Sequence, residues 1–131
     1  MNIIVDSTIW IDWIRRRIEH KEIVLPWIEK GTCYTCGVIQ VEVLRGILSN
    51  KLKDKFTELF SIMNYVHTSR ELWEEISETA WSLDRKGKVV PVPDLIIAQC
   101  AKISGSTLIT LDKDFKLIPG LKLSNSLLRK V

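Results

Sequence analysis

The sequence NIIVDSTIWIDWI at residues 2–14 decides the fold. Residues 2–6 predict a short buried strand that ends in an acid, because they are mostly apolar and β-branched. Ser7 or Thr8 then offers a helix N-cap. Apolar residues recur behind this cap at helical spacing, at Ile9, Trp10, Trp13 and Ile14. The chain therefore begins with a strand that runs directly into a helix, with Asp6 at the junction.

The rest of the chain alternates between strands and helices in the same way. Further strands are predicted at 32–36, near Tyr65 and Val66, at 107–111 and at 121–123. Helices are predicted at 23–30, 38–48, 51–62, around 72–83 and at about 94–103. Strands separated by helices imply a parallel sheet covered on both faces. We therefore expect an α/β fold, a single domain over residues 1–131 with a central parallel β-sheet of four to five strands flanked by α-helices.

The composition is that of an ordinary globular protein. Hydrophobic residues make up 46% of the 131 residues, which is enough for one packed core. No apolar run approaches the roughly 20 residues that span a bilayer, and the N-terminus lacks the basic start and cleavage site of a signal peptide. We therefore expect a cytoplasmic protein with no membrane association. In that reducing compartment its three cysteines are expected to be free thiols.

The net charge of +3 decides little by itself, but the basic residues are clustered. They gather at 15–17, at 51, 53 and 55, and at 85, 86 and 88. Such clusters are ordinarily solvated helix faces, although a phosphate-binding surface has the same composition. The sequence leaves both interpretations open.

Three aspartates stand where strands end or helices begin. Asp6 ends the first strand, Asp112 follows the strand at 107–111, and Asp94 opens the helix after Pro91 and Pro93. Sites in parallel sheets lie beyond the carboxyl ends of the strands, so these three acids are expected at one edge of the sheet. The alternative is structural, because aspartate is common at helix N-termini and in loops.

Glu42 stands inside the almost wholly apolar segment VIQVEVL at residues 38–44. A lone buried carboxylate is costly, so Glu42 requires either an ion pair with Arg45, one turn away, or a polar site shared with the aspartates. Four converging carboxylates need a counter-charge, which a hard cation such as Mg²⁺ or Mn²⁺ supplies through oxygen ligands. Such a metal activates water and stabilises a phosphorus-centred transition state, so a phosphodiester is the expected substrate.

Several segments taken together resemble the PIN-domain ribonucleases, and among them the VapC-type toxins of type II toxin–antitoxin systems. VDSTIWIDWI resembles the start of that family, and VIQVEVLRGI resembles its second motif. PDLIIAQCAKISGSTLITLDKDF resembles its third and fourth motifs, and the tail LIPGLKL is also typical. The motifs occur in order over nearly the whole chain, with no departure from the four-acid pattern of the family.

The resemblance implies a site built on four acids, which would be the catalytic and metal-ligating residues Asp6, Glu42, Asp94 and Asp112. Ser7 would lie beside the first acid and Thr110 beside the last, where either hydroxyl could hold a water or an acid in place. Asp114 would belong either to the metal site or to the turn that leads to Phe115. Arg45 would steady Glu42 or help to bind phosphate.

The resemblance also implies an activity and partners. The protein would be a metal-dependent endoribonuclease that uses Mg²⁺ or Mn²⁺ to hydrolyse phosphodiester bonds, with single-stranded or looped RNA as its substrate. It would form a homodimer and a complex with a cognate antitoxin. Three alternatives remain open: an RNA-binding or antitoxin-binding module without turnover, a housekeeping nuclease of similar fold, and a small-molecule phosphatase. One large group of such phosphatases has a second aspartate where this chain has Thr8.

Overall fold

The computed structural model describes residues 1–127, and its centre is a five-stranded sheet in the order β3-β2-β1-β4-β5. All four strand pairs are parallel. The strands are β1 Asn2–Val5, β2 Cys33–Thr35, β3 Asn64–Tyr65, β4 Ser106–Ile109 and β5 Leu123–Ser124. The predicted α/β fold with a parallel sheet of four to five strands is confirmed.

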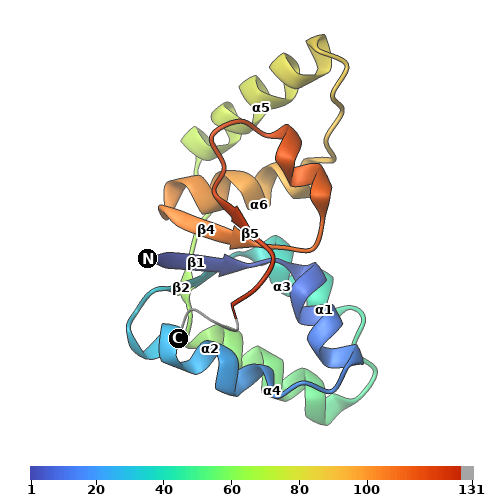
Figure 1. The fold of residues 1–131 in the computed structure, drawn as a ribbon, viewed down its shortest axis with the longest axis vertical. Helices are drawn as coiled ribbons and strands as arrows, with labels where there is room; N and C mark the ends of the chain where they lie inside the picture. The colour runs from blue at the N-terminus through green and yellow to red at the C-terminus, as the bar shows by residue number, and fades with distance from the viewer. Residues whose placement is uncertain (128–131) are drawn as a thin grey trace.

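The helices connect the strands and cover the sheet (Figure 1). They are α1 Ser7–Arg15, α2 His20–Glu29, α3 Gly37–Leu44, α4 Asn50–Ser61, α5 Arg70–Arg85 and α6 Val92–Ile103, followed by the short 3₁₀ helix η1 Lys113–Leu117. Among residues 1–127, no helix is both long enough and apolar enough to cross a membrane.

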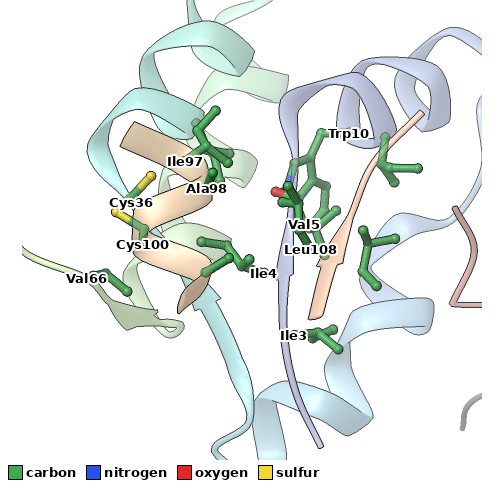
Figure 2. Packing of buried hydrophobic residues seen from close by; sticks show 14 of the residues in the cluster. Ile3, Ile4, Val5, Trp10, Cys36, Val66, Ile97, Ala98, Cys100 and Leu108 are labelled. Carbon is green, nitrogen blue, oxygen red and sulfur yellow. The ribbon is translucent and has the colours of Figure 1, made fainter. Parts of the chain in front are cut away.

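The central strand β1 is buried on both faces, as the continuous apolar run predicts. Ile3, Ile4 and Val5 have at most 1% of their surface exposed. Because side chains alternate along a strand, Ile4 points toward Ile97 and Ala98 of α6, whereas Ile3 points to the opposite side (Figure 2). The residue that follows β1, Asp6, therefore stands at the end of a strand that is buried on both faces.

Trp10 fixes the direction in which α1 leaves β1. Its indole Nε1 donates a hydrogen bond of 3.0 Å to the carbonyl oxygen of Val5. The ring is 1% exposed and makes edge-to-face contacts with Trp13, Phe56 and Phe60. Such pairs stabilise beyond the area they bury. The bend between β1 and α1, where Asp6 lies, is thus held from the core side.

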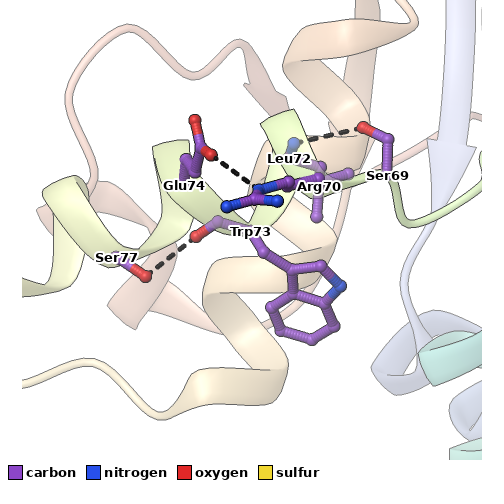
Figure 3. Close-up of polar contacts among 6 residues, drawn as sticks. All are labelled: Ser69, Arg70, Leu72, Trp73, Glu74 and Ser77. Carbon is purple, nitrogen blue, oxygen red and sulfur yellow. Dashed lines mark hydrogen bonds and ion pairs between the residues drawn. The ribbon is translucent and has the colours of Figure 1, made fainter.

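The long helix α5 begins with a side-chain cap. The Ser69 hydroxyl accepts a hydrogen bond from the backbone N–H of Leu72 at 3.2 Å (Figure 3). On the exposed face Arg70 pairs with Glu74 at 3.3 Å, and the Ser77 hydroxyl donates to the Trp73 carbonyl oxygen. One face of the helix is buried through Leu72, Ile76 and Leu83, as its amphipathic pattern predicts.

Several predicted boundaries were wrong at their ends. The helix expected at 38–48 ends at Leu44, and the last strand is Leu123–Ser124, not 121–123. That strand is defined by pairing with Leu108 and Ile109 of β4, which its own sequence does not reveal. The strand expected at 107–111 ends at Ile109; Thr110 stays buried beside Asp6, and the chain turns outward at Leu111, which is 48% exposed.

All three cysteines are free and buried. Cys33 lies on β2, but Cys36 lies beyond the strand, at the N-cap of α3. The expectation that Cys33 and Cys36 share one strand was therefore wrong. The sulfur of Cys36 faces that of Cys100 on α6 (Figure 2), and that contact is part of the core packing between α3 and α6.

Candidate active site

The four predicted acids come from four different elements. Asp6 is the N-cap of α1, Asp112 is the N-cap of η1, Asp94 lies in the first turn of α6, and Glu42 lies on α3. Asp6 and Asp112 follow the neighbouring strands β1 and β4, which run parallel. The topology thus brings the acids to the carboxyl edge of the sheet, where sites in such folds lie.

Asp6 is held by two threonine hydroxyls. The Oγ1 atoms of Thr8 and Thr110 each donate to Oδ2 of Asp6 at 2.7 Å. The carboxylate is only 2% exposed, so these charge-assisted bonds offset much of the cost of its burial. Both bonds go to the same oxygen. Within residues 1–127, Oδ1 of Asp6 accepts no hydrogen bond and remains available to a ligand.

The two threonines also close a ring between the ends of β1 and β4. Thr8 Oγ1 accepts from the backbone N–H of Leu111 at 3.1 Å, and Thr110 Oγ1 accepts from the backbone N–H of Asp112 at 3.0 Å. Thr110 was among the predicted residues, but Thr8 was considered only as a helix cap. In the sequence, Thr8 is recognisable only as a hydroxyl two residues after Asp6. This spacing fits both a helix cap and a hydrogen bond to the Asp6 carboxylate, so the sequence alone cannot distinguish the two roles.

Glu42 is held by Ser7. The Ser7 hydroxyl donates to Oε1 of Glu42 at 2.9 Å, so it bridges from the residue beside Asp6 to α3. Arg45 is exposed and makes no ion pair within residues 1–127. Of the two predicted environments for Glu42, the ion pair with Arg45 is absent from residues 1–127, and the polar site shared with the aspartates stays a prediction, which the bond from Ser7, the neighbour of Asp6, supports.

The pKa of Asp94 reflects the negative charges of the neighbouring acids. Its pKa is raised from the ordinary value of 3.8 to about 6. Burial is the largest cause, followed by the negative charges of Asp112, Asp6, Glu42 and then Asp114. Because like charges disfavour ionisation, this shift shows that the carboxylates share one electrostatic environment.

Asp114 has an observed role in the turn. Its backbone N–H donates to Oδ1 of Asp112 at 2.9 Å, which caps the start of η1. This bond fixes the orientation of the Asp112 carboxylate. The side chain of Asp114 is exposed, and its charge makes the smallest contribution to the shift of Asp94.

The chemistry of these donors fits a hard divalent cation. The set consists of carboxylate oxygens, which suit Mg²⁺ or Mn²⁺, and contains no imidazole or thiolate that would favour zinc. Among residues 1–127, no group of three or more Asp, Glu, His or Cys side chains lies close enough together to hold a metal ion. Burial and the charges of the neighbouring acids raise the pKa of Asp94, and a divalent cation would offset the repulsion between these acids.

Comparison with known families gives the decisive observation: the PIN domain model matches residues 3–121. The chain belongs to the PIN domain family. The resemblance noted in the sequence motifs is thereby confirmed, and the five-stranded sheet described above is a PIN fold.

Individual PIN-domain relatives agree with this assignment. Ribonuclease VapC21 from Mycobacterium tuberculosis is 29% identical over 113 residues, which cover 82% of this chain and 76% of the relative. A toxin–antitoxin complex from Klebsiella pneumoniae has a TM-score of 0.66 at 26% identity, covering 92% of this chain and 95% of that one. DNA-bound VapBC from Salmonella typhimurium has a TM-score of 0.77 at 20% identity, covering 95% and 97% of the chains, and shows a common fold.

Proposed function

We propose that this PIN domain is a cytoplasmic, metal-dependent endoribonuclease that hydrolyses RNA phosphodiester bonds and acts as the toxin of a toxin–antitoxin pair. The observation that carries the proposal is the set of four carboxylates that follow β1 and β4 or lie on α3 and α6, among which burial and the charges of the other acids raise the pKa of Asp94 to about 6. The relative named as a ribonuclease supports the reaction, and the similarity to a toxin–antitoxin complex supports the partner.

The residues that would hold Mg²⁺ or Mn²⁺ are Asp6, Glu42, Asp94 and Asp112. A bound ion would supply an activated water and stabilise the charge that develops on the phosphorus. The protein itself orients the carboxylates through hydrogen bonds. Thr8 and Thr110 occupy Oδ2 of Asp6, so that Oδ1 faces a ligand, while Ser7 and the backbone of Asp114 orient Glu42 and Asp112. Holding ligands by outer hydrogen bonds is how metal sites are tuned.

The antitoxin is proposed to bind at an apolar groove of about 380 Å³ between α1, α3 and α4. Ile11, Val43 and Leu52 line this groove, and Leu48 at its edge is 99% exposed. An exposed apolar groove is a common feature of a protein interface. We expect an apolar segment of the antitoxin to fill it, and Leu48→Asp to prevent co-purification with a co-expressed candidate antitoxin while leaving RNA cleavage intact.

The homodimer is proposed to form through α5. Trp73 and Trp81 on this helix are 43% and 61% exposed, and the Arg85 guanidinium lies 4.9 Å from the ring of Trp81. Exposed tryptophans are enriched at interfaces. Sedimentation equilibrium on the wild type and on a Trp73→Ser, Trp81→Ser variant tests this proposal: the wild type should be a dimer and the variant a monomer.

The central experiment is RNA cleavage with matched controls. Purified protein is incubated with a pool of structured RNAs in Mg²⁺, in Mn²⁺ and in EDTA, beside an Asp94→Asn variant purified identically. Discrete fragments that require metal and disappear with the variant are expected, and a chromogenic phosphate monoester should stay intact. Cleavage that survives both EDTA and the substitution would exclude this site, and binding without fragments would favour a module without turnover.

A further inference from the structure

A hollow of about 510 Å³ adjoins the acidic site on its β5 side. The end of β4, η1 and β5 surround it, and these segments follow one another in orange and red in Figure 1. Asp112 is part of its wall, so whatever fills the hollow lies beside the carboxylates. A volume of roughly 300–1,000 Å³ is typical of sites for small ligands, and one nucleotide fits within that range.

Two lysines supply the positive charge that the acidic site lacks. Lys113 and Lys116 line the hollow and are exposed, and neither makes an ion pair within residues 1–127. Both belong to the 3₁₀ helix η1. Residues three apart in a 3₁₀ helix lie on the same face, so the two ammonium groups project from one side. A polyanion repelled by four carboxylates would be attracted here.

The remaining wall offers surface for a base. Leu111 is 48% exposed and Leu123 is half-buried, so both present apolar surface to the hollow. Asn125 is exposed at the same wall. Its amide carries both donors and an acceptor, the groups with which proteins recognise the edge of an unpaired base. Cations, apolar surface and an amide together match a nucleotide and do not match a lipid or an apolar peptide.

We propose that this hollow binds the nucleotide next to the scissile phosphate of single-stranded RNA, with Lys113 and Lys116 on its backbone phosphate and Asn125 on its base. The proposal rests on the ribonuclease function proposed above and adds to it the location of the substrate strand. The hollow adjoins Asp112, so the strand is placed on the β5 side of the site. Asn125 is then a residue that determines which base stands beside the cut.

Binding measured without cleavage tests the phosphate contacts. The probe is a fluorescein-labelled single-stranded RNA of about 12 nucleotides and mixed sequence, titrated in Mg²⁺ with Asp94→Asn protein, which lacks one of the proposed catalytic acids. A Lys113→Gln, Lys116→Gln variant is compared with a Lys21→Gln, Lys30→Gln variant of equal charge. Lys21 and Lys30 are exposed, at the start and just beyond the end of α2, away from η1 in Figure 1.

Each lysine that contacts phosphate adds about 0.7 to the slope of log Kd against log salt for a single strand. The variant at η1 should therefore lose about 1.4 from this slope and bind at least about tenfold more weakly at low salt, whereas the α2 variant keeps the slope of the parent. Equal slopes in the two variants would overturn the assignment of the hollow and leave the ribonuclease standing. Failure of the parent to bind RNA, together with failure of the wild type to cleave it, would overturn both proposals.

Cleavage-site sequencing tests the base contact in otherwise wild-type protein. Asn125→Ala should change the base found next to the cut, whereas Asn50→Ala, an exposed asparagine on α4, should not. An unchanged distribution of cut sites with Asn125→Ala would remove the role of Asn125. A changed distribution with both variants would show that neither asparagine reads the base directly, and would overturn it as well.

Discussion

At the scale of one residue, Asp6 shows how this chain holds a buried carboxylate in a fixed orientation. The side chain is buried, and two hydroxyls donate hydrogen bonds to the same carboxylate oxygen. A buried carboxylate with fewer donors would take up a proton or distort the end of the strand. Thr8 and Thr110 therefore act on Asp6 as positioning residues, and their removal should affect ligation more than folding.

Replacing Thr8 by valine tests this role. Valine has nearly the same shape but cannot donate to Asp6 or accept from Leu111, so the carboxylate keeps only its bond from Thr110 and is held less firmly. We expect Mn²⁺ to bind about 10–100-fold more weakly, as is usual when an outer hydrogen bond to a ligand is lost. Isothermal titration with Mn²⁺ measures this affinity.

The control for that experiment is Thr8→Ser, which keeps the hydroxyl and should bind Mn²⁺ nearly as the wild type does. Circular dichroism of both variants separates a loss of ligation from a loss of fold. If Thr8→Val and Thr8→Ser bound Mn²⁺ with the same affinity, the positioning role of the hydroxyl would be refuted.

Asp94→Asn gives a prediction about stability and pH. The folded-state pKa of about 6 lies above the ordinary value of 3.8. Ionisation of Asp94 is therefore less favourable in the folded protein than in the unfolded chain. This penalty is absent below about pH 3.8, grows up to about pH 6 and is complete above it. The full difference between the two pKa values corresponds to a loss of about 3 kcal/mol in the free energy of unfolding. Solvent screening of the partly exposed side chain reduces this loss to about 1 kcal/mol.

In EDTA, Asp94→Asn should therefore be more stable than the wild type at pH 7 by about 1 kcal/mol, and equally stable near pH 4. Urea unfolding at both pH values measures the difference. A variant that was less stable at pH 7 would mean that Asp94 is held by favourable contacts and not by repulsion.

The residues of the candidate site differ in whether their roles could be predicted from the sequence. Glu42 could be predicted because a carboxylate inside an apolar helix needs an explanation. Thr8 could not, because its spacing from Asp6 also fits a helix cap, and its second partner, the backbone of Leu111, is more than a hundred residues away along the chain. The partner of Glu42 was likewise undecided, because Arg45 was the nearer candidate along the chain and Ser7 is close only in the folded sheet.

At the scale of elements, the strands and helices with strong internal patterns were predicted correctly. The buried run of β1 and the amphipathic α5 depend on their own residues. β5 and η1 do not, because β5 consists of two residues defined by pairing with β4, and η1 is begun by the Asp112 cap. Short elements of this kind are specified by tertiary contacts, so the predicted bounds of the last strand were wrong and η1 was not predicted at all.

The cap of α5 provides a prediction at this scale. Ser69→Ala removes the acceptor for the Leu72 N–H shown in Figure 3, and the loss of a serine N-cap typically costs about 1 kcal/mol. Because α5 carries none of the four acids, the rate of RNA cleavage should not change below the unfolding temperature. Thermal unfolding and a cleavage assay on the same preparation check both statements.

Ser69→Asp serves as the matched control, since aspartate also caps helices and its charge is favourable at the N-terminus. It should restore stability to the level of the wild type. A variant Ser69→Ala that unfolded at the temperature of the wild type would show that the cap contributes nothing in this context.

At the scale of the whole molecule, metal binding should stabilise the fold. The acids come from elements at both ends of the chain, so an ion held by them binds only the folded state. At a free Mg²⁺ concentration about 100-fold above its Kd, the gain is about 2.7 kcal/mol, which raises the melting temperature by several degrees. Differential scanning fluorimetry in Mg²⁺ and in EDTA measures the shift.

The same comparison with Asp94→Asn should show a much smaller shift, because one of the proposed ligands is lost. Lys21→Gln, at an exposed position of α2, serves as the control and should shift as the wild type does. Equal shifts in the wild type and in Asp94→Asn would place the stabilising ion elsewhere.

The threonine ring that joins Asp6 to Thr110 has a consequence for synthesis of the protein. The Asp6 carboxylate is made more than a hundred residues before the Thr110 hydroxyl that holds it, and β4 cannot pair with β5 until residues 123–124 follow. A growing chain on the ribosome therefore carries an incomplete site until these residues have been made. Products of translation interrupted before that point should lack the proposed nuclease activity and be harmless to the RNA of the cell that makes them.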